Sequence, residues 1–170
     1  MQLKIMCYNT WLGNNIKGIA KHIANINPDV VGLQEIMENY PNNGNHCTAH
    51  TLLNILQKRY HKIYFISYFP TFVSDRQTSK RIIGNAVLSA VPFIDNHVHY
   101  LSSLEMYLTR SSKITARDAE PRVAIETSIK VGRKTLRVIN VHMGVSENLG
   151  PTKYRDIQFN NLLKLIVDGN

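Results

Sequence analysis

The feature that most constrains the fold of this chain is its opening unit, in which two apolar runs flank a helical pattern. Residues 3–8 alternate as a strand does, and residues 30–34 form a short apolar run that ends at Gln34-Glu35. Asn27-Pro28-Asp29 ends the segment between them. In that segment apolar residues recur at helical spacing, at Ile16, Ile19, Ala20, Ile23 and Ile26. The pattern predicts a βαβ unit with two parallel strands and a right-handed connection.

The rest of the chain predicts helices and strands without a repeat or a domain linker. We expect a polar loop over 36–46, a helix over 48–60, a strand over 63–69 and a final helix over 151–167. A polar stretch at 70–81 is followed by β-like runs between 82 and 142, which a second polar stretch at 102–119 interrupts and which end in a hairpin that turns at Gly132-Arg133. Because no helix separates these runs, we expect antiparallel strands added to the first sheet, within a single α/β domain.

The charge of the chain favours anionic partners. Twenty Lys and Arg against twelve Asp and Glu give a net charge of +8, which suits nucleic acid or phosphorylated substrates. The N-terminus lacks the apolar segment of a signal peptide, and no apolar stretch approaches the roughly 18 residues of a membrane span. These features predict a soluble, cytoplasmic protein. Its cysteines have no metal-ligand spacing, and Cys7 is expected to be a buried, reduced thiol.

Polar side chains follow the first two predicted strands at the point where each strand ends. Asn9 follows the first run and Glu35 the second. The carboxyl ends of neighbouring parallel strands lie side by side, and open α/β sheets bind ligands there. Mg2+ prefers a few oxygen ligands and completes its shell with water and substrate phosphate. Taken alone, Glu35 is more simply explained as a first solvated residue, but beside Asn9 it forms a candidate Mg2+ site.

Four further polar residues lie on or beside later predicted strands: Asn85, Arg122, Asn140 and His142. Each has a simple structural explanation by itself, such as a loop hydrogen bond or a satisfied core histidine. Phosphodiester hydrolysis, however, needs a cation to neutralise charge, donors for the phosphate oxygens and a group that orients water. Together these side chains and the Asn9–Glu35 pair match the first two needs.

Five segments carry a family resemblance, in the order LKIMCYNTW, PDVVGLQE, GNAVLS, EPRVAIE and INVHMG. From Leu3 to about Gln158 the chain resembles the endonuclease/exonuclease/phosphatase superfamily of DNase I-like proteins. The resemblance implies a four-layer α/β/β/α sandwich, with mixed β-sheets flanked by helices. It also implies Mg2+-dependent cleavage of phosphoester bonds, with Mn2+ as an alternative cation.

The resemblance implies a role for each matched residue. Glu35 would be the main metal ligand, and Asn9 its partner in the metal and phosphate site. The catalytic positions would be His142, which matches the histidine that hydrogen-bonds the scissile phosphate, and Asn140, which precedes it. Asn85 and Arg122 would be substrate-binding residues near the pocket.

The chain departs from the family pattern after the final helix. Family members continue into a strand that ends in Gly-Asp-Phe-Asn or similar and later into Ser-Asp-His, which position the nucleophile and activate water. No Ser-Asp-His occurs here, and Asp168-Gly169-Asn170 follows a helical run, where a C-terminal cap is the simpler explanation. We therefore expect residues 1–170 to be a C-terminally incomplete domain. Its uncovered apolar sheet face would need a complementary C-terminal fragment or a dimer.

These observations leave several functions open. The favoured one is a Mg2+-dependent phosphoesterase that acts on nucleic acid and has little activity in this truncated form. The alternatives are a non-catalytic remnant of the same fold that binds nucleic acid or another polyanion, and a hydrolase similar to sphingomyelinases or inositol phosphatases. Basic residues of the two polar stretches either line the substrate side or belong to solvated loops, and the sequence favours the second interpretation at least as much. These residues are Arg76, Lys80, Arg81, Arg110, Lys113 and Arg117.

Overall fold

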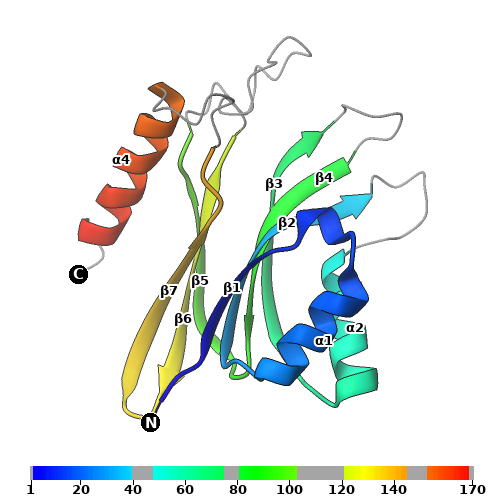
Figure 1. Cartoon of the computed structure of the whole chain (residues 1–170). Coiled ribbons are helices and arrows are strands. Elements are labelled where there is room, and N and C mark those ends of the chain that lie inside the picture. Colours follow the sequence, from blue (N-terminus) through cyan, green and yellow to red (C-terminus); the bar gives the residue numbers. More distant parts are fainter. Residues whose placement is uncertain (1, 40–47, 75–80, 103–120, 145–152, 169–170) are drawn as a thin grey trace.

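The computed structural model of the chain describes residues 2–39, 48–74, 81–102, 121–144 and 153–168, and within these ranges two sheets lie between helices (Figure 1). In chain order the elements are β1 (Ile5–Asn9), η1 (Trp11–Gly13), α1 (Ile16–Ile26), β2 (Val30–Asn39), α2 (Thr48–Tyr60), β3 (Phe65–Ser74), β4 (Arg81–Ser89), β5 (Phe93–Tyr100), β6 (Val123–Val131), β7 (Lys134–Val141) and α4 (Lys153–Asp168).

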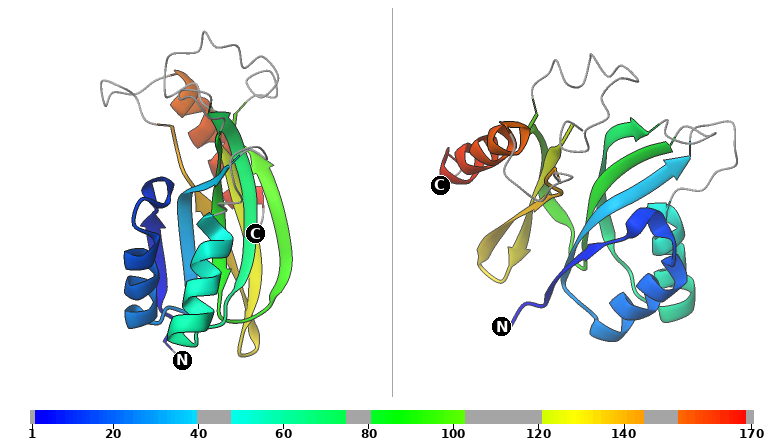
Figure 2. Two further views of the ribbon diagram at one scale, coloured as in Figure 1. Left: turned by 90° about the vertical axis from the view of Figure 1, so that its right-hand side faces the viewer. Right: turned by 45° about the horizontal axis from the view of Figure 1, so that its top comes forward.

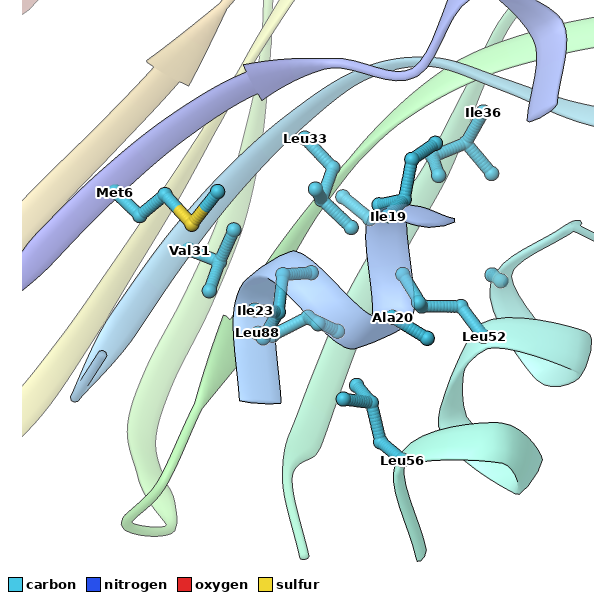
Figure 3. Packing of buried hydrophobic residues seen from close by; sticks show 12 residues of the cluster. Met6, Ile19, Ala20, Ile23, Val31, Leu33, Ile36, Leu52, Leu56 and Leu88 are labelled. Carbon is cyan, nitrogen blue, oxygen red and sulfur yellow. The ribbon is translucent and has the colours of Figure 1, made fainter. Parts of the chain in front are cut away.

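The first sheet has the strand order β1-β2-β4-β3 and contains the predicted βαβ unit. β1 and β2 are parallel, with Asn9 opposite Gln34, whereas β4 pairs antiparallel with both β2 and β3. Helices α1 and α2 cover the outer face of this sheet (Figure 1). Between helices and sheet lies the main core (Figure 3), which includes Ile23, Leu33, Leu52, Leu56 and Leu88, each fully buried.

Helix α1 begins and ends as its sequence predicts. Asn15 caps the N-terminus, because its side-chain oxygen accepts a hydrogen bond of 3.0 Å from the backbone N–H of Gly18. Asn27 ends the helix in the left-handed conformation at φ 49°, which Asn tolerates better than most residues. Its apolar stripe then faces the sheet, with Ile19, Ala20 and Ile23 buried.

The second sheet has the order β5-β6-β7, all antiparallel, and packs face to face on the first. A smaller core between the two sheets contains Val30, Val87, Ile125 and Ile129, all buried. Helix α4 lies on the outer side of the second sheet, opposite α1 and α2, as Figure 1 and the right-hand view of Figure 2 show. The layers are thus helix, sheet, sheet and helix, which confirms the predicted α/β/β/α sandwich.

Polar contacts attach α4 to the second sheet. The Arg137 guanidinium of β7 donates to the carbonyl of Leu165 at 2.7 Å, and the Asn161 amide donates to the carbonyl of Leu101 at 2.9 Å. The helix leaves a row of exposed apolar side chains at helical spacing, with Phe159 52%, Leu163 41% and Ile166 44% exposed. No helix in the described part of the chain is both long and apolar enough to cross a membrane.

Two predictions about the strands were wrong. The strand expected to end at Gln34 continues to Asn39, because Ile36 turns back into the core after an irregularity and is fully buried. The later β-like runs were expected to extend the first sheet, but β5, β6 and β7 form a sheet of their own. Apolar side chains on both faces of the first sheet explain this arrangement, since one face packs on helices and the other on the second sheet.

Cys7 was predicted to be buried and is exposed. It lies on β1, at the edge of the first sheet in the described strand order, and alternates with Met6 and Tyr8, which face the helical core. The neighbouring residue on the same face of β1, Ile5, is 61% exposed. The inner face of β1 is therefore uncovered in the described part of the chain.

Candidate functional site

Four predicted site residues lie at one edge of the sandwich, three of them at or next to the ends of strands from both sheets. Asn9 ends β1, Glu35 lies within β2, Arg122 directly precedes β6 and His142 directly follows β7. The antiparallel hairpin places the start of β6 and the end of β7 side by side, at the same end of the molecule as the carboxyl end of β1 (Figure 1). Residues separated by more than 100 positions in the sequence thus meet at one edge.

Glu35 owes its orientation to a β-bulge. Leu33 pairs with Ala86 and Ile36 with Gly84, so Gln34 and Glu35 together lie opposite the single residue Asn85. Glu35 has a φ of 55°, a left-handed conformation that is uncommon for a residue with a side chain. Such conformations persist where surrounding contacts hold them, and they are frequent at functional sites.

The residue that holds this bulge is Thr10, which the sequence analysis did not single out. Its hydroxyl lies 3.0 Å from the carbonyl oxygen of Gln34 and 2.8 Å from that of Glu35, and can donate a hydrogen bond to either. Its backbone N–H donates to the carbonyl of Gln34 at 2.9 Å. Thr10 is 2% exposed. A hydroxyl residue directly after a strand-terminal asparagine was the available signal, but nothing in the sequence shows the bulge that it contacts.

Asn9 and Glu35 are in direct contact. The Asn9 amide nitrogen donates to Glu35 Oε1 at 3.0 Å, and the Asn9 amide oxygen accepts from the backbone N–H of Trp11 at 2.8 Å. The Glu35 side chain is 24% exposed, so its carboxylate remains open to solvent. The adjacency predicted from the two parallel strand ends is therefore confirmed.

His142 lies between Glu35 and Arg122. Its Nε2 is 3.8 Å from Glu35 Oε1, and its Nδ1 is 3.3 Å from Arg122 Nη1. A guanidinium only donates hydrogen bonds, so Nδ1 is the acceptor and the proton of the neutral ring is assigned to Nε2, on the side of Glu35. Burial lowers the pKa of His142 and the Arg122 charge lowers it further, while the Glu35 carboxylate opposes both by raising it. The ring is therefore neutral at pH 7.

Asn140 and Asn85 lie deeper and connect the two sheets. Asn140 on β7 is 5% exposed, and its amide nitrogen donates at 2.9 Å to the carbonyls of both Leu33 and Ala86. Its amide oxygen accepts from Gln34 Nε2 at 2.6 Å. Asn85, which is 2% exposed, donates to the carbonyl of Val123 on β6 at 3.2 Å. Both side chains are thus buried and form hydrogen bonds between the two sheets.

A second buried polar group supports the loops around Arg122 and His142. Ser102 accepts from the backbone N–H of Arg122 at 3.0 Å and lies 3.5 Å from Gln158 Nε2. Gln158 is fully buried and accepts from the backbone N–H of Gly144, two residues after His142, at 2.9 Å. A glutamine among the apolar positions of the last predicted helix was the only sequence signal for this group.

The described donors at this edge are hard oxygen atoms. Glu35 offers a partly exposed carboxylate, and the Asn9 amide oxygen accepts from the Trp11 N–H while its nitrogen contacts Glu35. No group of three or more His, Cys, Asp and Glu residues suited to a metal occurs in the described ranges. Of the basic residues considered for the substrate side, Arg81 begins β4 and its side chain is not described; the other five lie outside the described residues.

A helix–sheet–sheet–helix sandwich of two β-sheets flanked by helices is the architecture of DNase I-like proteins. Residues 6–167 match the profile of the Endonuclease/Exonuclease/phosphatase family, and this chain belongs to that family. No curated protein sequence matches the chain.

Solved structures with the same fold share little sequence with this chain. A family protein from Leptotrichia buccalis C-1013-b and one from Beutenbergia cavernae DSM 12333 each have a TM-score of 0.72 and 20% identity, over 96% and 99% of this chain. ANGEL2, a 2′,3′-cyclic phosphatase in complex with adenosine-2′,3′-vanadate, has a TM-score of 0.60 and 16% identity over 98% of this chain. The chain spans 61%, 44% and 48% of these three structures.

Proposed function

We propose that this chain supplies the metal-binding and phosphate-binding residues of a phosphoester hydrolase whose substrate is nucleic acid. The contact of Asn9 with Glu35, 3.8 Å from His142, is the observation that carries the proposal. Family membership supports the reaction class, and the net charge of +8 supports a polyanionic substrate. A fold relative that binds adenosine-2′,3′-vanadate supports a nucleotide-containing substrate.

Glu35 and Asn9 would hold Mg2+, or Mn2+ in its place. Their oxygen atoms suit a hard cation that keeps most of its shell for water and substrate phosphate, and the Glu35 carboxylate is open to solvent. When bound, such a cation neutralises phosphate charge and polarises the bond to be cleaved. The bulge that turns Glu35 toward Asn9 is then a device that fixes the position of the carboxylate.

His142 would bind a phosphate oxygen through its Nε2–H. Because the ring is neutral with its proton on Nε2, it offers one directed donor beside the Glu35 carboxylate. Arg122 fixes this tautomer through Nδ1 and adds positive charge behind the ring, so it acts through His142. Asn85 and Asn140 hold β6 and β7 on the first sheet and thereby position Arg122 and His142.

We propose that the groups that activate water come from a polypeptide segment that adds to β7 and covers α4. Two observations support an added segment: the second sheet ends at β7 among the described strands, and apolar side chains of α4 and β1 are exposed, including Phe159, Ile166 and Ile5. A second copy of the chain is the other occupant. A concentration series by light scattering distinguishes them, because a dimer contact would give a mass that doubles with concentration.

Metal binding by the full chain tests the central proposal. Mn2+ titration followed by electron paramagnetic resonance should show one site, and Glu35→Gln should weaken it at least tenfold. Glu38→Gln removes a carboxylate from the same strand and should leave the site unchanged. Equal Mn2+ affinity in wild type and Glu35→Gln would refute the metal site. Rapid, Glu35-dependent hydrolysis of bis-p-nitrophenyl phosphate by this chain alone would refute the requirement for an added segment.

A non-catalytic role in binding nucleic acid is the second candidate, and the high positive charge favours it. Binding through charge alone should weaken steeply with salt and should not depend on Glu35 or on Mg2+. Metal-dependent binding that Glu35→Gln abolishes would favour the hydrolase. Cleavage of a sphingolipid or inositol phosphate in preference to an oligonucleotide would instead identify a hydrolase of the sphingomyelinase or inositol phosphatase kind.

A further inference from the structure

The turn after β1 carries the only tryptophan of the chain, and that side chain is exposed. Trp11 opens η1, directly after Asn9 and Thr10, and it is 72% exposed. Burying a large aromatic side chain stabilises a fold, and an exposed tryptophan forgoes that contribution. A single exposed apolar residue is common on protein surfaces, so exposure alone assigns no role.

The backbone of this turn adds a second observation. Trp11 and Leu12 have φ values of 45° and 58°, so two successive residues with side chains adopt the left-handed conformation. This conformation is unfavourable for such residues and persists only where other contacts hold it. Here the Asn9 side chain accepts from the Trp11 N–H at 2.8 Å, and the Gly13 N–H donates to the Thr10 carbonyl at 2.9 Å.

The position of Trp11 is therefore tied to the proposed metal and phosphate site. The Asn9 amide nitrogen donates to the Glu35 carboxylate, and its oxygen accepts from the backbone N–H of Trp11. One side chain therefore holds both the Glu35 carboxylate and the Trp11 backbone in place. The turn also contacts β2, which carries Glu35. Two residues of chain span at most about 7 Å, so the Cα atom of Trp11 lies no further than that from the Cα atom of Asn9, a separation comparable to that between a phosphate and the base of its own nucleotide.

We propose that Trp11 is a stacking platform for a nucleobase next to the phosphate bound by Asn9, Glu35 and His142. The proposal rests on the function proposed above and narrows the substrate to one with an accessible base, such as single-stranded nucleic acid. Tryptophan rings stack on bases of any sequence, and basic charge nearby holds the backbone. The net charge of +8 fits this class of substrate.

The surroundings of Trp11 favour a base over a membrane surface. The exposed residues that directly follow the turn are polar or basic, namely Asn14, Asn15 and Lys17. The other strongly exposed apolar residue of this region, Ile5, lies six residues earlier, about 20 Å away along an extended strand. Insertion into a lipid interface relies on a continuous apolar face, which these residues do not form.

Binding of a fluorescein-labelled eight-nucleotide oligothymidylate to the full chain with Mg2+ tests the platform. Trp11→Ala should weaken binding about tenfold, as stacking of one base predicts, whereas Trp11→Phe should retain most of the affinity. Ile63→Ala is the matched control, because Ile63 is 70% exposed in the segment before β3 and should have no effect. An abasic oligomer of equal length and charge should bind wild type and Trp11→Ala equally.

The outcomes separate this proposal from the one on which it rests. Equal affinity of wild type and Trp11→Ala for the base-containing oligomer would overturn the platform, while loss of Mn2+ binding in Glu35→Gln would still support the metal site. Trp11 emission offers a direct reading, since it should be quenched by the oligothymidylate but not by the abasic oligomer. A blue shift with sphingomyelin vesicles and no quenching by oligothymidylate would overturn base stacking in favour of a lipid surface.

Discussion

Removal of the Asn140 side chain should lower the stability of the protein by breaking hydrogen bonds that connect its two sheets. Its amide makes three buried hydrogen bonds: to the carbonyls of Leu33 and Ala86 on the first sheet, and from the side chain of Gln34. Asn140→Ala leaves these partners in a buried position without the group that satisfies them, and the change also opens a small cavity.

The expected loss of stability follows from the number of bonds. A net value of about 1–1.5 kcal/mol for each bond gives roughly 3–5 kcal/mol in total. Small domains unfold with only about 5–15 kcal/mol, so this loss is a large part of the whole. With a typical urea dependence of about 2 kcal/mol per molar, the midpoint of unfolding should fall by about 2 M. Asn161→Ala removes one partly buried bond, to the carbonyl of Leu101, and should cost about 1 kcal/mol.

Urea unfolding followed by circular dichroism measures both variants, and Gly32 supplies an independent check. A methyl group at Gly32 would lie 2.9 Å from Asn140 Oδ1 and 3.2 Å from its Cγ, so Gly32→Ala should displace this amide and destabilise the protein. In the Asn140→Ala background, Gly32→Ala should reduce the free energy of unfolding less than it does in wild type, because the shortened side chain leaves room for the added methyl group. Additive effects, or a loss for Asn140→Ala no larger than for Asn161→Ala, would refute the inter-sheet connection.

Three further predictions follow from charges and backbone conformation. In metal-free protein, nuclear magnetic resonance should place the pKa of His142 below 6.5. Arg122→Gln should raise that pKa, because the Arg122 charge opposes protonation of the ring. Glu35→Gln should lower it further, because the Glu35 charge favours protonation. The hydrogen bond from Arg137 lowers the pKa of Glu126 below 4.5. The pair therefore stabilises the fold above pH 4.5, and this contribution is lost as the pH falls through the lowered pKa. In urea unfolding, Glu126→Gln should lose less stability than wild type over this pH range. Asn27 has a φ of 49°, so Asn27→Ala should lower the melting temperature while Asn27→Gly should not, and equal melting temperatures would contradict the left-handed cap.

Local patterns in the sequence predicted the parts of the fold that short-range chemistry determines. The helical spacing of apolar residues and the Asn27-Pro28 stop gave α1 and the parallel pair β1 and β2, and the expected helix at 48–60 has the bounds observed for α2. The adjacency of Asn9 and Glu35 followed from the same reasoning, because parallel strand ends meet at one edge. The expected helix at the end of the chain is also confirmed as α4.

Long-range packing determined the parts that the sequence did not reveal. β2 continues past the bulge at Gln34-Glu35 to Asn39. The Thr10 hydroxyl and the burial of Ile36 stabilise the bulge, and neither is visible in the local sequence. Cys7 was misplaced because a strand at the edge of a sheet can bury one face and leave the other uncovered. Asn140 was expected at the catalytic centre, and its buried hydrogen bonds to the other sheet became visible only in three dimensions.

The geometry of the site depends on both kinds of determinant at once. Asn9 and Glu35 belong to neighbouring strands of one sheet, so their contact is fixed by local pairing. His142 belongs to the other sheet, and its distance of 3.8 Å from Glu35 depends on how the sheets pack. The Asn140 connection spans 107 residues of sequence and lies two residues before His142. A variant that loosens this connection should therefore weaken phosphate binding through His142 before it weakens metal binding through Glu35, even under conditions in which the chain remains folded.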